Sequence, residues 1–348
     1  MKFLFFGAGA IGAYVGGSLA LSGCDVAFVE QPEPAEILRR EGFVLALGTQ
    51  THRISTPEVF TSAVDALQKS APDVAVFALK SYDTGAAIEP LRSLAGSLPP
   101  ALSLQNGVDN EPALESVFGA GRVIAGTVTS AIGRGRAGEI TVERKRGLGL
   151  SAGHALSPGL AQAMNRAGLN ARLYSAARPM KWSKLLTNLT ANASSAILGM
   201  APRAIFSDPR LFELEREMLR ECLRVMRAGK IDAVDLPGTP VRLFAFAVEN
   251  LPRRLAQPLL TRAIGGGRGG KMPSFYLDLK SGRGKTEVEW LNGAVAREGE
   301  RLGIATPVNR LLTNTLVRLT KDPSLQKDYF ENPEGFLRLL TASETDSL

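Results

Sequence analysis

The sequence predicts an α/β protein in two parts, an N-terminal domain over residues 1–175 and an all-helical C-terminal domain over residues 176–348. Short apolar runs alternate with helical patterns in the first part, as is typical of a parallel sheet covered by helices. From Met180 onward, apolar residues recur at a spacing of three and four, which indicates helices. The composition changes between Tyr174 and Pro179, so the domain boundary is placed there.

The chain begins with a predicted strand, a glycine turn, a helix and a second strand. The apolar run Lys2–Phe6 precedes the turn, the helix extends to about Ser22, and the second strand, Asp25–Val29, is followed by an acidic residue. The turn reads GAGAIG, which is the G-x-G-x-x-G fingerprint of a Rossmann-type dinucleotide-binding domain. The fingerprint is informative here because it lies between a strand and a helix.

Each glycine of the fingerprint has a physical role. Gly7 permits a tight turn, Gly9 lets the backbone approach a pyrophosphate, and Gly12 lets the helix pack against the strand. The N–H groups and partial positive charge of the first helical turn then attract the pyrophosphate. A carboxylate at the end of the second strand can accept hydrogen bonds from the adenosine ribose. The cofactor-binding residues predicted in this segment are Gly7, Gly9, Ala10, Ile11, Gly12 and Glu30.

Two other interpretations of the segment Lys2–Glu30 compete with this one. A lysine before an apolar run is typical of a secretory signal, but Asp25 and Glu30 close the segment without a cleavage-like region. A transmembrane helix would also be apolar, but the many glycines favour strand, turn, helix and strand.

The composition narrows the function classes. The net charge is +7, but the basic residues are mostly interleaved with glutamates, so we expect a solvated basic surface and no nucleic-acid interface. Two cysteines, Cys24 and Cys222, cannot form a disulfide framework, which favours a reducing, cytoplasmic location. With two histidines and no cysteine pairs at ligand spacing, no metal site is predicted.

Two polar residues follow apolar strands of the first domain. Lys80 comes after the run Asp73–Ala78, and Asn106 comes after Ala101–Leu104. Parallel α/β sheets bind ligands at the carboxyl ends of their strands, so both residues are predicted to lie near the ligand. Further strands are expected over Phe43–Leu47, His52–Thr56, Val123–Thr129, Glu139–Glu143 and Leu148–Leu150, with a glycine–arginine loop over Gly133–Gly138 and a helix over Pro158–Ala167.

The helix predicted over about Met180–Ile197 has a polar stripe. Lys184, Asn188 and Asn192 recur at every fourth position, so a continuous helix places them on one face, beside leucines. Because asparagine is a poor helix former, the stripe predicts a binding site. Further helices are expected over Pro209–Ala228, Thr239–Asn250, Glu287–Gly303 (capped by Thr286) and Val308–Thr320, and Gly265–Gly270 is expected to be a lid or a simple loop.

These motifs together resemble the ketopantoate reductase family, also called 2-dehydropantoate 2-reductase. Along nearly the whole chain, and in the family's order, they are GAGAIG, LKSYD at Lys80, LQNGVDN at Asn106, KWSKLLTNLTAN at Lys184, PSFYLD at Ser274 and KTEVEWLNG at Glu287. The resemblance implies NAD(P)H-dependent reduction of a 2-oxo acid to a 2-hydroxy acid. The implied substrate is 2-dehydropantoate, reduced to pantoate for pantothenate biosynthesis, or a close analogue.

The resemblance also implies roles for single residues. Lys184 corresponds to the catalytic lysine, the general acid, and Glu287 to the catalytic carboxylate. Asn188, Asn192 and Ser274 match substrate-binding positions, while Lys80 and Asn106 match positions near the cofactor and the reacting carbonyl.

Two departures from the family pattern bear on specificity. Members that use NADPH usually have a basic residue after the second strand, whereas this chain has Glu30 and Gln31. The family therefore implies NADPH, but a carboxylate there would repel a 2′-phosphate and favours NADH. Near Ser274 the usual Ser-Met-Leu-Gln-Asp pattern is Ser-Phe-Tyr-Leu-Asp, which predicts a bulkier pocket wall.

Two other functions are compatible with the sequence. One is a related β-hydroxyacid or opine-type dehydrogenase, and the other is a non-catalytic dinucleotide-sensing protein. Under the main interpretation the partner is a small 2-oxo acid, with no nucleic acid and no membrane, and a homodimer is a candidate assembly.

Overall fold

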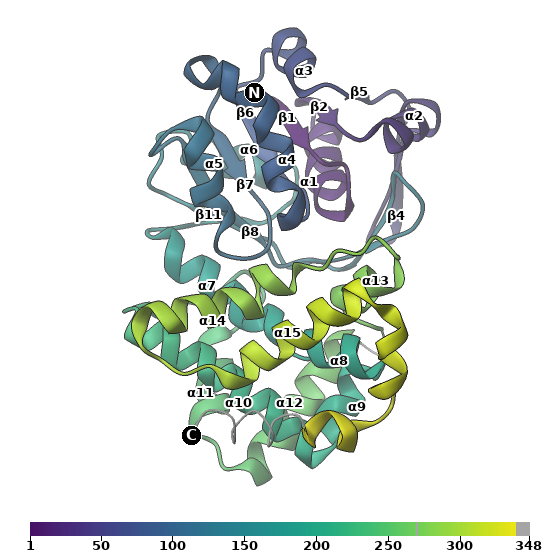
Figure 1. Ribbon diagram of the computed structural model, residues 1–348. Helices are drawn as coiled ribbons and strands as arrows, with labels where there is room; N and C mark the ends of the chain where they lie inside the picture. Colours follow the sequence, from purple (N-terminus) through teal and green to yellow (C-terminus); the bar gives the residue numbers. More distant parts are fainter. Residues whose placement is uncertain (269–270, 339–348) are drawn as a thin grey trace. The chain divides into compact units, whose positions relative to one another are not determined.

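The computed structural model describes residues 1–268 and 271–338. The chain divides into two compact units. Unit 1 comprises Met1–Lys181 and the short excursion Asp235–Thr239, and unit 2 comprises Trp182–Val234 and the chain from Pro240 onward (Figure 1). The chain therefore passes from one unit to the other three times, at 181–182, 234–235 and 239–240.

Unit 1 is built on an eight-stranded sheet with the order β12-β11-β8-β7-β6-β1-β2-β5. Neighbouring strands are parallel except β8 and β11, which are antiparallel. The order reverses between β1 and β6, which makes the carboxyl ends of these two strands the topological switch point. The strands are β1 (Lys2–Phe6), β2 (Asp25–Val29), β5 (Glu58–Phe60), β6 (Val74–Phe77), β7 (Ala101–Ser103), β8 (Val123–Val128), β11 (Leu148–Ser151) and β12 (Ala171–Tyr174).

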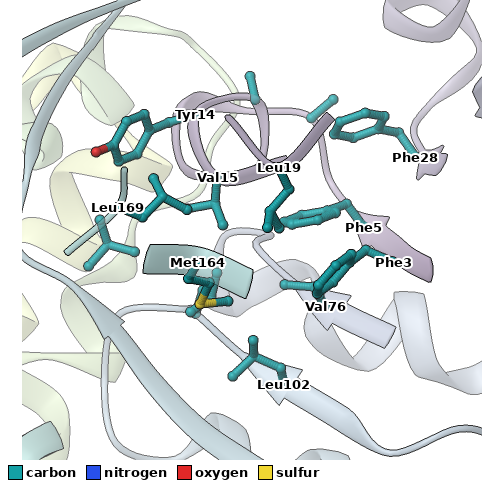
Figure 2. Packing of buried hydrophobic residues seen from close by; sticks show 14 of the residues in the cluster. Phe3, Phe5, Tyr14, Val15, Leu19, Phe28, Val76, Leu102, Met164 and Leu169 are labelled. Atoms are coloured by element: carbon teal, nitrogen blue, oxygen red, sulfur yellow. The ribbon is translucent and has the colours of Figure 1, made fainter. Parts of the chain in front are cut away.

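Helices cover both faces of this sheet. Phe3 and Phe5 of β1 point to one face, where they pack with α1 and α6, and Leu4 and Phe6 point to the other, with α3, α4 and α5. Figure 2 shows part of the first cluster, with Phe3 and Phe5 beside the apolar residues of α1. Burial on both faces explains the continuous apolar runs of the central strands. The helices are α1 (Ala10–Leu21), α2 (Pro32–Glu41), α3 (Ala63–Ser70), α4 (Thr84–Ile88), α5 (Asn110–Phe118) and α6 (Ser157–Arg166), with the 3₁₀ helices η1 (Ser81–Asp83) and η2 (Glu89–Ser97).

A second, four-stranded sheet encloses α1 from its other side. Its order is β4-β3-β10-β9, and α1 packs against β3, β9 and β10 as well as against β1 and β2. A Cβ atom on Gly16 would lie 2.8 Å from the ring of Phe28, and one on Gly17 would lie 2.6 Å from Leu45. An α1 buried between two sheets has to be apolar all round, which is why its sequence also resembles a membrane helix. The strands are β3 (Phe43–Leu47), β4 (Gln50–Ile54), β9 (Ala131–Arg134) and β10 (Glu139–Arg144).

This second sheet corrects one prediction. The strand expected over Glu139–Glu143 exists, but it does not close the main sheet; it pairs in parallel with β3 and antiparallel with β9. The loop expected over Gly133–Gly138 is shorter, because Gly133 and Arg134 belong to β9. The hairpin expected over Phe43–Leu47 and His52–Thr56 is confirmed as β3 and β4.

Unit 2 is built mainly of helices, and the predicted fold class is confirmed. The helices are α7 (Ala177–Leu189), which begins in unit 1, α8 (Asn192–Leu198), α9 (Pro202–Ser207), α10 (Pro209–Ala228), α11 (Val241–Asn250), α12 (Arg253–Arg268), α13 (Ser274–Lys280), α14 (Asn292–Leu302) and α15 (Pro307–Lys321), with the 3₁₀ helices η3 (Glu287–Trp290) and η4 (Pro323–Asp328). In the part of the chain that the structure describes, no helix has both the length and the apolar character needed to cross a bilayer.

Three predictions for unit 2 are corrected. The single helix expected over Met180–Ile197 is two helices, because Ala191 adopts φ +49° between α7 and α8. The Ala191 N–H donates to the carboxylate of Glu215 on α10 at 2.7 Å, which stabilises the break. Helices α9, α12 and α13 were not predicted. Finally, α12 extends through Arg268 into the expected glycine loop, while Gly269 and Gly270 lie outside the described residues.

The excursion Asp235–Thr239 joins unit 1 through two backbone carbonyls. The Tyr174 hydroxyl donates to the Asp235 carbonyl at 2.9 Å, and the Thr129 hydroxyl donates to the Pro237 carbonyl at 2.8 Å. These contacts hold a segment from the second half of the chain against the edge strand β12 and the end of β8.

Candidate functional site

The glycine turn lies at the switch point, directly after β1. Gly7 adopts φ +95°, which favours glycine, and a Cβ atom on Gly12 would lie 1.9 Å from the Gly7 carbonyl oxygen. A Cβ atom on Gly9 would meet no atom within 4 Å. Gly7 and Gly12 are therefore glycines because of the protein's own packing, whereas the space beside Gly9 is open to a ligand.

The amino end of α1 presents backbone donors at this turn. Gly9 is the N-cap residue and makes no side-chain cap, and the first intrahelical bond is that of the Ala13 N–H to the Gly9 carbonyl. The N–H groups of Ala10, Ile11 and Gly12 therefore have no partner within the helix. Such a helix end is suited to an anion such as a pyrophosphate, so these residues fit the dinucleotide that the sequence implies.

Glu30 lies at the end of β2 and contacts the same turn. One of its carboxylate oxygens accepts the Ala8 N–H at 2.8 Å, and the other accepts the Gln31 N–H at 2.9 Å. A carboxylate offers about four acceptor positions, so each oxygen can accept one more donor. The structure thus brings Glu30 to the glycine turn, where it can accept ribose hydroxyls.

The loops that contain Lys80 and Asn106 are joined by buried polar side chains. The Asn106 carbonyl accepts from the Ser81 hydroxyl at 2.9 Å and from the Asn110 amide at 2.6 Å. The buried Gln105 amide donates to the Leu79 carbonyl at 3.2 Å and to the Thr84 hydroxyl at 2.7 Å. Because these bonds cross between the segments after β6 and β7, they fix the two loops in one arrangement.

The polar stripe predicted on one continuous helix is divided between two helices. Lys184 and Asn188 are half-buried on α7, one turn apart, while Asn192 is the first residue of α8. The break does not separate the asparagines, because the Asn192 amide donates to the Asn188 carbonyl at 3.2 Å. The prediction of one continuous helix is therefore wrong, while the contact between Asn188 and Asn192 is kept.

Asn192 also contacts the amino end of α13. Its side-chain oxygen accepts the Phe275 N–H at 3.1 Å, and its amide lies 3.4 Å from the Ser274 hydroxyl. Asn192 is 4% exposed, so it caps α13 from inside the protein. The structure therefore joins two predicted substrate-binding residues, Asn192 and Ser274, and adds a structural role for the first.

Glu287 begins η3 directly after Thr286, as predicted, but the single helix expected over Glu287–Gly303 is divided into the 3₁₀ helix η3 and α14. The Thr286 hydroxyl accepts the Val288 N–H at 3.4 Å, and Glu287 itself is 1% exposed. The η3 segment packs against α14 and α15. A carboxylate buried to this degree requires polar or charged partners.

Lys181 and Glu215 are among the buried charged residues that sequence reasoning missed. Lys181 on α7 is 5% exposed and contacts the Gln105 and Gly126 carbonyls and the Glu111 carboxylate. Glu215 on α10 is fully buried and also accepts the Ser194 hydroxyl at 2.6 Å. The only available signal for Lys181 was a second lysine three residues before Lys184 in the KWSK motif. The amphipathic helix pattern gave no signal that Glu215 is buried, because acidic residues are common on such helices.

Among the described residues, no group of three or more His, Cys, Asp or Glu side chains is arranged to hold a metal ion. The candidate residues fall into two sets: the glycine turn and the loops after β6 and β7 in unit 1, and the polar residues Lys184 and Asn188 of α7 with those of α8, α13 and η3 in unit 2.

A glycine turn at the switch point of a parallel sheet, followed by a unit of helices, defines a two-domain dinucleotide-binding protein of the dehydrogenase type. The model of the family described as ketopantoate reductase PanE/ApbA matches residues 3–153, and the model of its C-terminal domain matches residues 176–319. The chain belongs to the ketopantoate reductase family, as its motifs predict, and is a pyridine nucleotide-dependent oxidoreductase acting on a CH–OH group.

Relatives and solved structures agree with this assignment. A 2-dehydropantoate 2-reductase of Halobacterium salinarum is 29% identical over 331 residues, covering 92% of this chain and 99% of the relative. The structure of a PanE/ApbA family ketopantoate reductase from Ralstonia eutropha is 27% identical, with a TM-score of 0.76 and coverage of 94% and 100%. A D-mandelate dehydrogenase, solved with NADH and anilino(oxo)acetate, has the same fold at 22% identity, with a TM-score of 0.76 and coverage of 93% and 99%.

Proposed function

We propose that this protein reduces a 2-oxo acid to a 2-hydroxy acid with NADH or NADPH, and that the acid is 2-dehydropantoate or a close analogue. The observation that carries the proposal is the hydrogen-bonded group Asn188–Asn192–Ser274, one helical turn beyond Lys184. An ammonium beside amide and hydroxyl donors suits a ligand with a carbonyl oxygen and a carboxylate. The named relatives, which act on 2-dehydropantoate, support the same substrate.

Lys184 has the central chemical role in this proposal. When bound, a reduced nicotinamide would supply the hydride for the ketone carbon, and negative charge would then develop on the carbonyl oxygen. The Lys184 ammonium stabilises that charge by a hydrogen bond and transfers a proton to the oxygen. Asn188, Asn192 and Ser274 orient the substrate through its carboxylate and hydroxyl groups.

Glu287 acts through Lys184. A buried carboxylate next to a lysine favours the charged ammonium and opposes the effect of desolvation, which favours the neutral amine. We therefore assign Glu287 the role of holding Lys184 in its protonated form and in position. Lys80 and Asn106, whose loops are fixed to each other, contact the cofactor and the reacting carbonyl.

NADH is the cofactor that the charges at the glycine turn favour. Glu30 is held beside that turn by two backbone N–H groups, and Gln31, which follows it, is neutral. A 2′-phosphate would add a second negative charge next to this carboxylate.

A substrate panel tests the proposal. Initial rates are measured with NADH and NADPH on 2-dehydropantoate, bulkier 2-oxo acids, a 3-oxo acid, and a 2-oxo acid with an amino acid. We expect turnover of a 2-oxo acid alone, and Lys184→Ala should lower kcat by about two to four orders of magnitude. Lys327→Ala, an exposed lysine of η4, is the matched control and should leave kcat unchanged.

Other results of the substrate panel would indicate one of the alternative functions. Turnover of the 3-oxo acid would indicate a β-hydroxyacid dehydrogenase, and dependence on the amino acid would indicate an opine-type enzyme. Tight dinucleotide binding without any turnover would indicate a sensor. An unchanged kcat in Lys184→Ala would remove the role of this lysine as the general acid.

A further inference from the structure

Lys181 makes three close polar contacts inside unit 1. Its Nζ atom lies 2.8 Å from the Gln105 carbonyl, 3.3 Å from the Gly126 carbonyl and 2.8 Å from the Glu111 carboxylate. The ammonium donates hydrogen bonds to the two carbonyls and forms an ion pair with the carboxylate. The side chain is 5% exposed, and that of Glu111 is 16% exposed. This is a largely buried ion pair that is also hydrogen-bonded to the backbone.

The acceptors belong to the loops of the candidate site. Gln105 directly precedes Asn106, and its amide also fixes the segment after β6 through the Leu79 carbonyl. Gly126 lies in β8, and Glu111 lies in the first turn of α5. Lys181 therefore attaches the start of α7 to the loop that contains Asn106.

The same helix carries the proposed general acid. Lys184 follows Lys181 by three residues on α7, which is less than one turn and about 4.5 Å of helical rise. The long N-terminal segment of unit 1 ends at Lys181, and the next residue, Trp182, belongs to unit 2. The anchor is thus at the last residue of α7 that belongs to unit 1.

We propose that Lys181, paired with Glu111, is a positioning residue that fixes where α7 leaves the dinucleotide-binding unit, and through the helix sets the position of Lys184. The proposal rests on the proposed function, since it needs Lys184 to act on a substrate. A misplacement of about 1 Å in a reacting group can lower turnover about 100-fold, so a rigid anchor one turn away matters.

A purely structural role would give a different pattern. Replacing both members of a buried ion pair by uncharged residues of similar volume is often neutral for stability, because the desolvation of both charges is avoided. Removing one member leaves a buried charge without its partner and destabilises the protein. The double variant Lys181→Met/Glu111→Gln removes both charges, so its kcat reports the positioning of Lys184 without the added effect of an unpaired buried charge on stability.

The experiment compares four proteins: wild type, Lys181→Met, the double variant and Glu221→Gln. Glu221 is a buried carboxylate of α10 outside the site and serves as the matched control. For each, the unfolding midpoint, the dinucleotide Kd, kcat and KM are measured. Amide hydrogen exchange is followed over residues 177–184 and, for reference, over α6.

We expect the double variant to unfold at a somewhat lower midpoint, because the Gln105 and Gly126 carbonyls lose their donor, but to remain folded under the assay conditions with a dinucleotide Kd within about twofold of wild type. In this folded protein kcat should fall about 10- to 100-fold and exchange over residues 177–184 should become faster. A kcat within twofold of wild type would overturn the proposal. A loss of kcat matched by an equal loss in Glu221→Gln would do the same. If the double variant fails to fold, Glu111→Gln replaces it and is assayed well below its own unfolding midpoint: a kcat that falls at least about 10-fold more than in Glu221→Gln supports the proposal, and a smaller difference overturns it.

Failure of the proposed function is recognised separately. If wild type turns over none of the acids in the panel, hydrogen exchange alone decides whether Lys181 fixes α7. Faster exchange over residues 177–184 but not over α6 supports the anchor, and unchanged exchange overturns it.

Discussion

The Glu30 carboxylate accepts the backbone N–H of Ala8 at 2.8 Å, which joins the end of β2 to the glycine turn. The bond holds a negative charge in a fixed position beside the proposed site of the adenosine ribose. A mobile carboxylate could move away from a 2′-phosphate, but one held by two backbone donors cannot do so without breaking a hydrogen bond.

Glu30→Gln should weaken the preference for NADH. The variant keeps a side-chain acceptor and removes the charge, so the kcat/KM ratio of NADH over NADPH should fall about 10-fold, which corresponds to about 1.4 kcal/mol. Steady-state rates with both cofactors measure it. Glu33→Gln, an exposed carboxylate in the first turn of α2, is the control and should leave the ratio unchanged. An identical ratio in Glu30→Gln would show that Glu30 does not select the cofactor.

Alanine substitutions at Gly9 and Gly12 should differ in their effect on stability. Gly9→Ala places its Cβ in open space at φ −70°, so the unfolding midpoint should stay the same while the dinucleotide Kd rises at least about 10-fold, because the methyl group occupies the path of the pyrophosphate. Gly12→Ala places its Cβ 1.9 Å from the Gly7 carbonyl and should lower the midpoint as well. Normal dinucleotide binding by a folded Gly9→Ala would contradict the placement of the pyrophosphate.

The two asparagines of the site should also be separable. Asn188→Ala should raise KM for the acid and lower stability less than Asn192→Ala does, because the higher helix propensity of alanine, about 0.5 kcal/mol, offsets part of the loss of the side chain. Asn192→Ala should raise KM and also lower stability by about 1–2 kcal/mol, since the Phe275 N–H loses its acceptor at the start of α13. Urea unfolding and kinetics on both variants measure this. Equal stability of the two variants would exclude the capping role of Asn192.

The buried carboxyl group of Glu221 should make the free energy of unfolding depend on pH. Burial raises the pKa of its carboxyl group from 4.5 to about 7, although hydrogen bonds from the Val308 and Asn309 backbones oppose the rise. Between pH 4.5 and about 7, the Glu221 carboxyl group therefore keeps its proton in the native state but loses it in the unfolded state. The resulting stabilisation is complete below pH 4.5 and is lost as the pH rises through about 7.

The free energy of unfolding should thus fall by up to about 3 kcal/mol from pH 5 to pH 8 through this one group. Urea unfolding at several pH values measures it. Glu221→Gln, which cannot ionise, should flatten the curve, while Glu300→Gln, an exposed carboxylate of α14, should leave it as in wild type. A curve of the same slope in Glu221→Gln would assign the dependence to other groups.

Local patterns predicted the parts of the fold that local chemistry determines. The helix Pro209–Ala228 was predicted with its observed ends, because Asp208 caps it through the Arg210 and Leu211 N–H groups and proline follows at the first position. The glycine turn was predicted for the same reason, since its spacing is a steric requirement.

Contacts distant in the chain account for the errors. The break between α7 and α8 depends on Glu215, 24 residues away from Ala191, and no local signal at Thr190 or Ala191 indicates it. The second sheet is not predicted, because the partner of the strand Glu139–Arg144 is β3, which lies about a hundred residues earlier in the chain. The role of Lys181 was missed because two of its acceptors are backbone carbonyls, 76 and 55 residues upstream. Every residue has a backbone carbonyl, so the sequence does not indicate which carbonyls accept a hydrogen bond from a distant side chain.

The enclosure of α1 between two sheets limits how the coenzyme preference of this protein could be redesigned. Any larger residue at Gly16 or Gly17 would collide with Phe28 or Leu45, so the helix that presents its amino end to the coenzyme tolerates little change along its length. Gln31, Pro32 and Glu33, at the start of α2, are exposed to solvent. Directed evolution of coenzyme use should therefore accumulate its successful substitutions in these exposed residues and in Glu30, and leave the buried helix untouched.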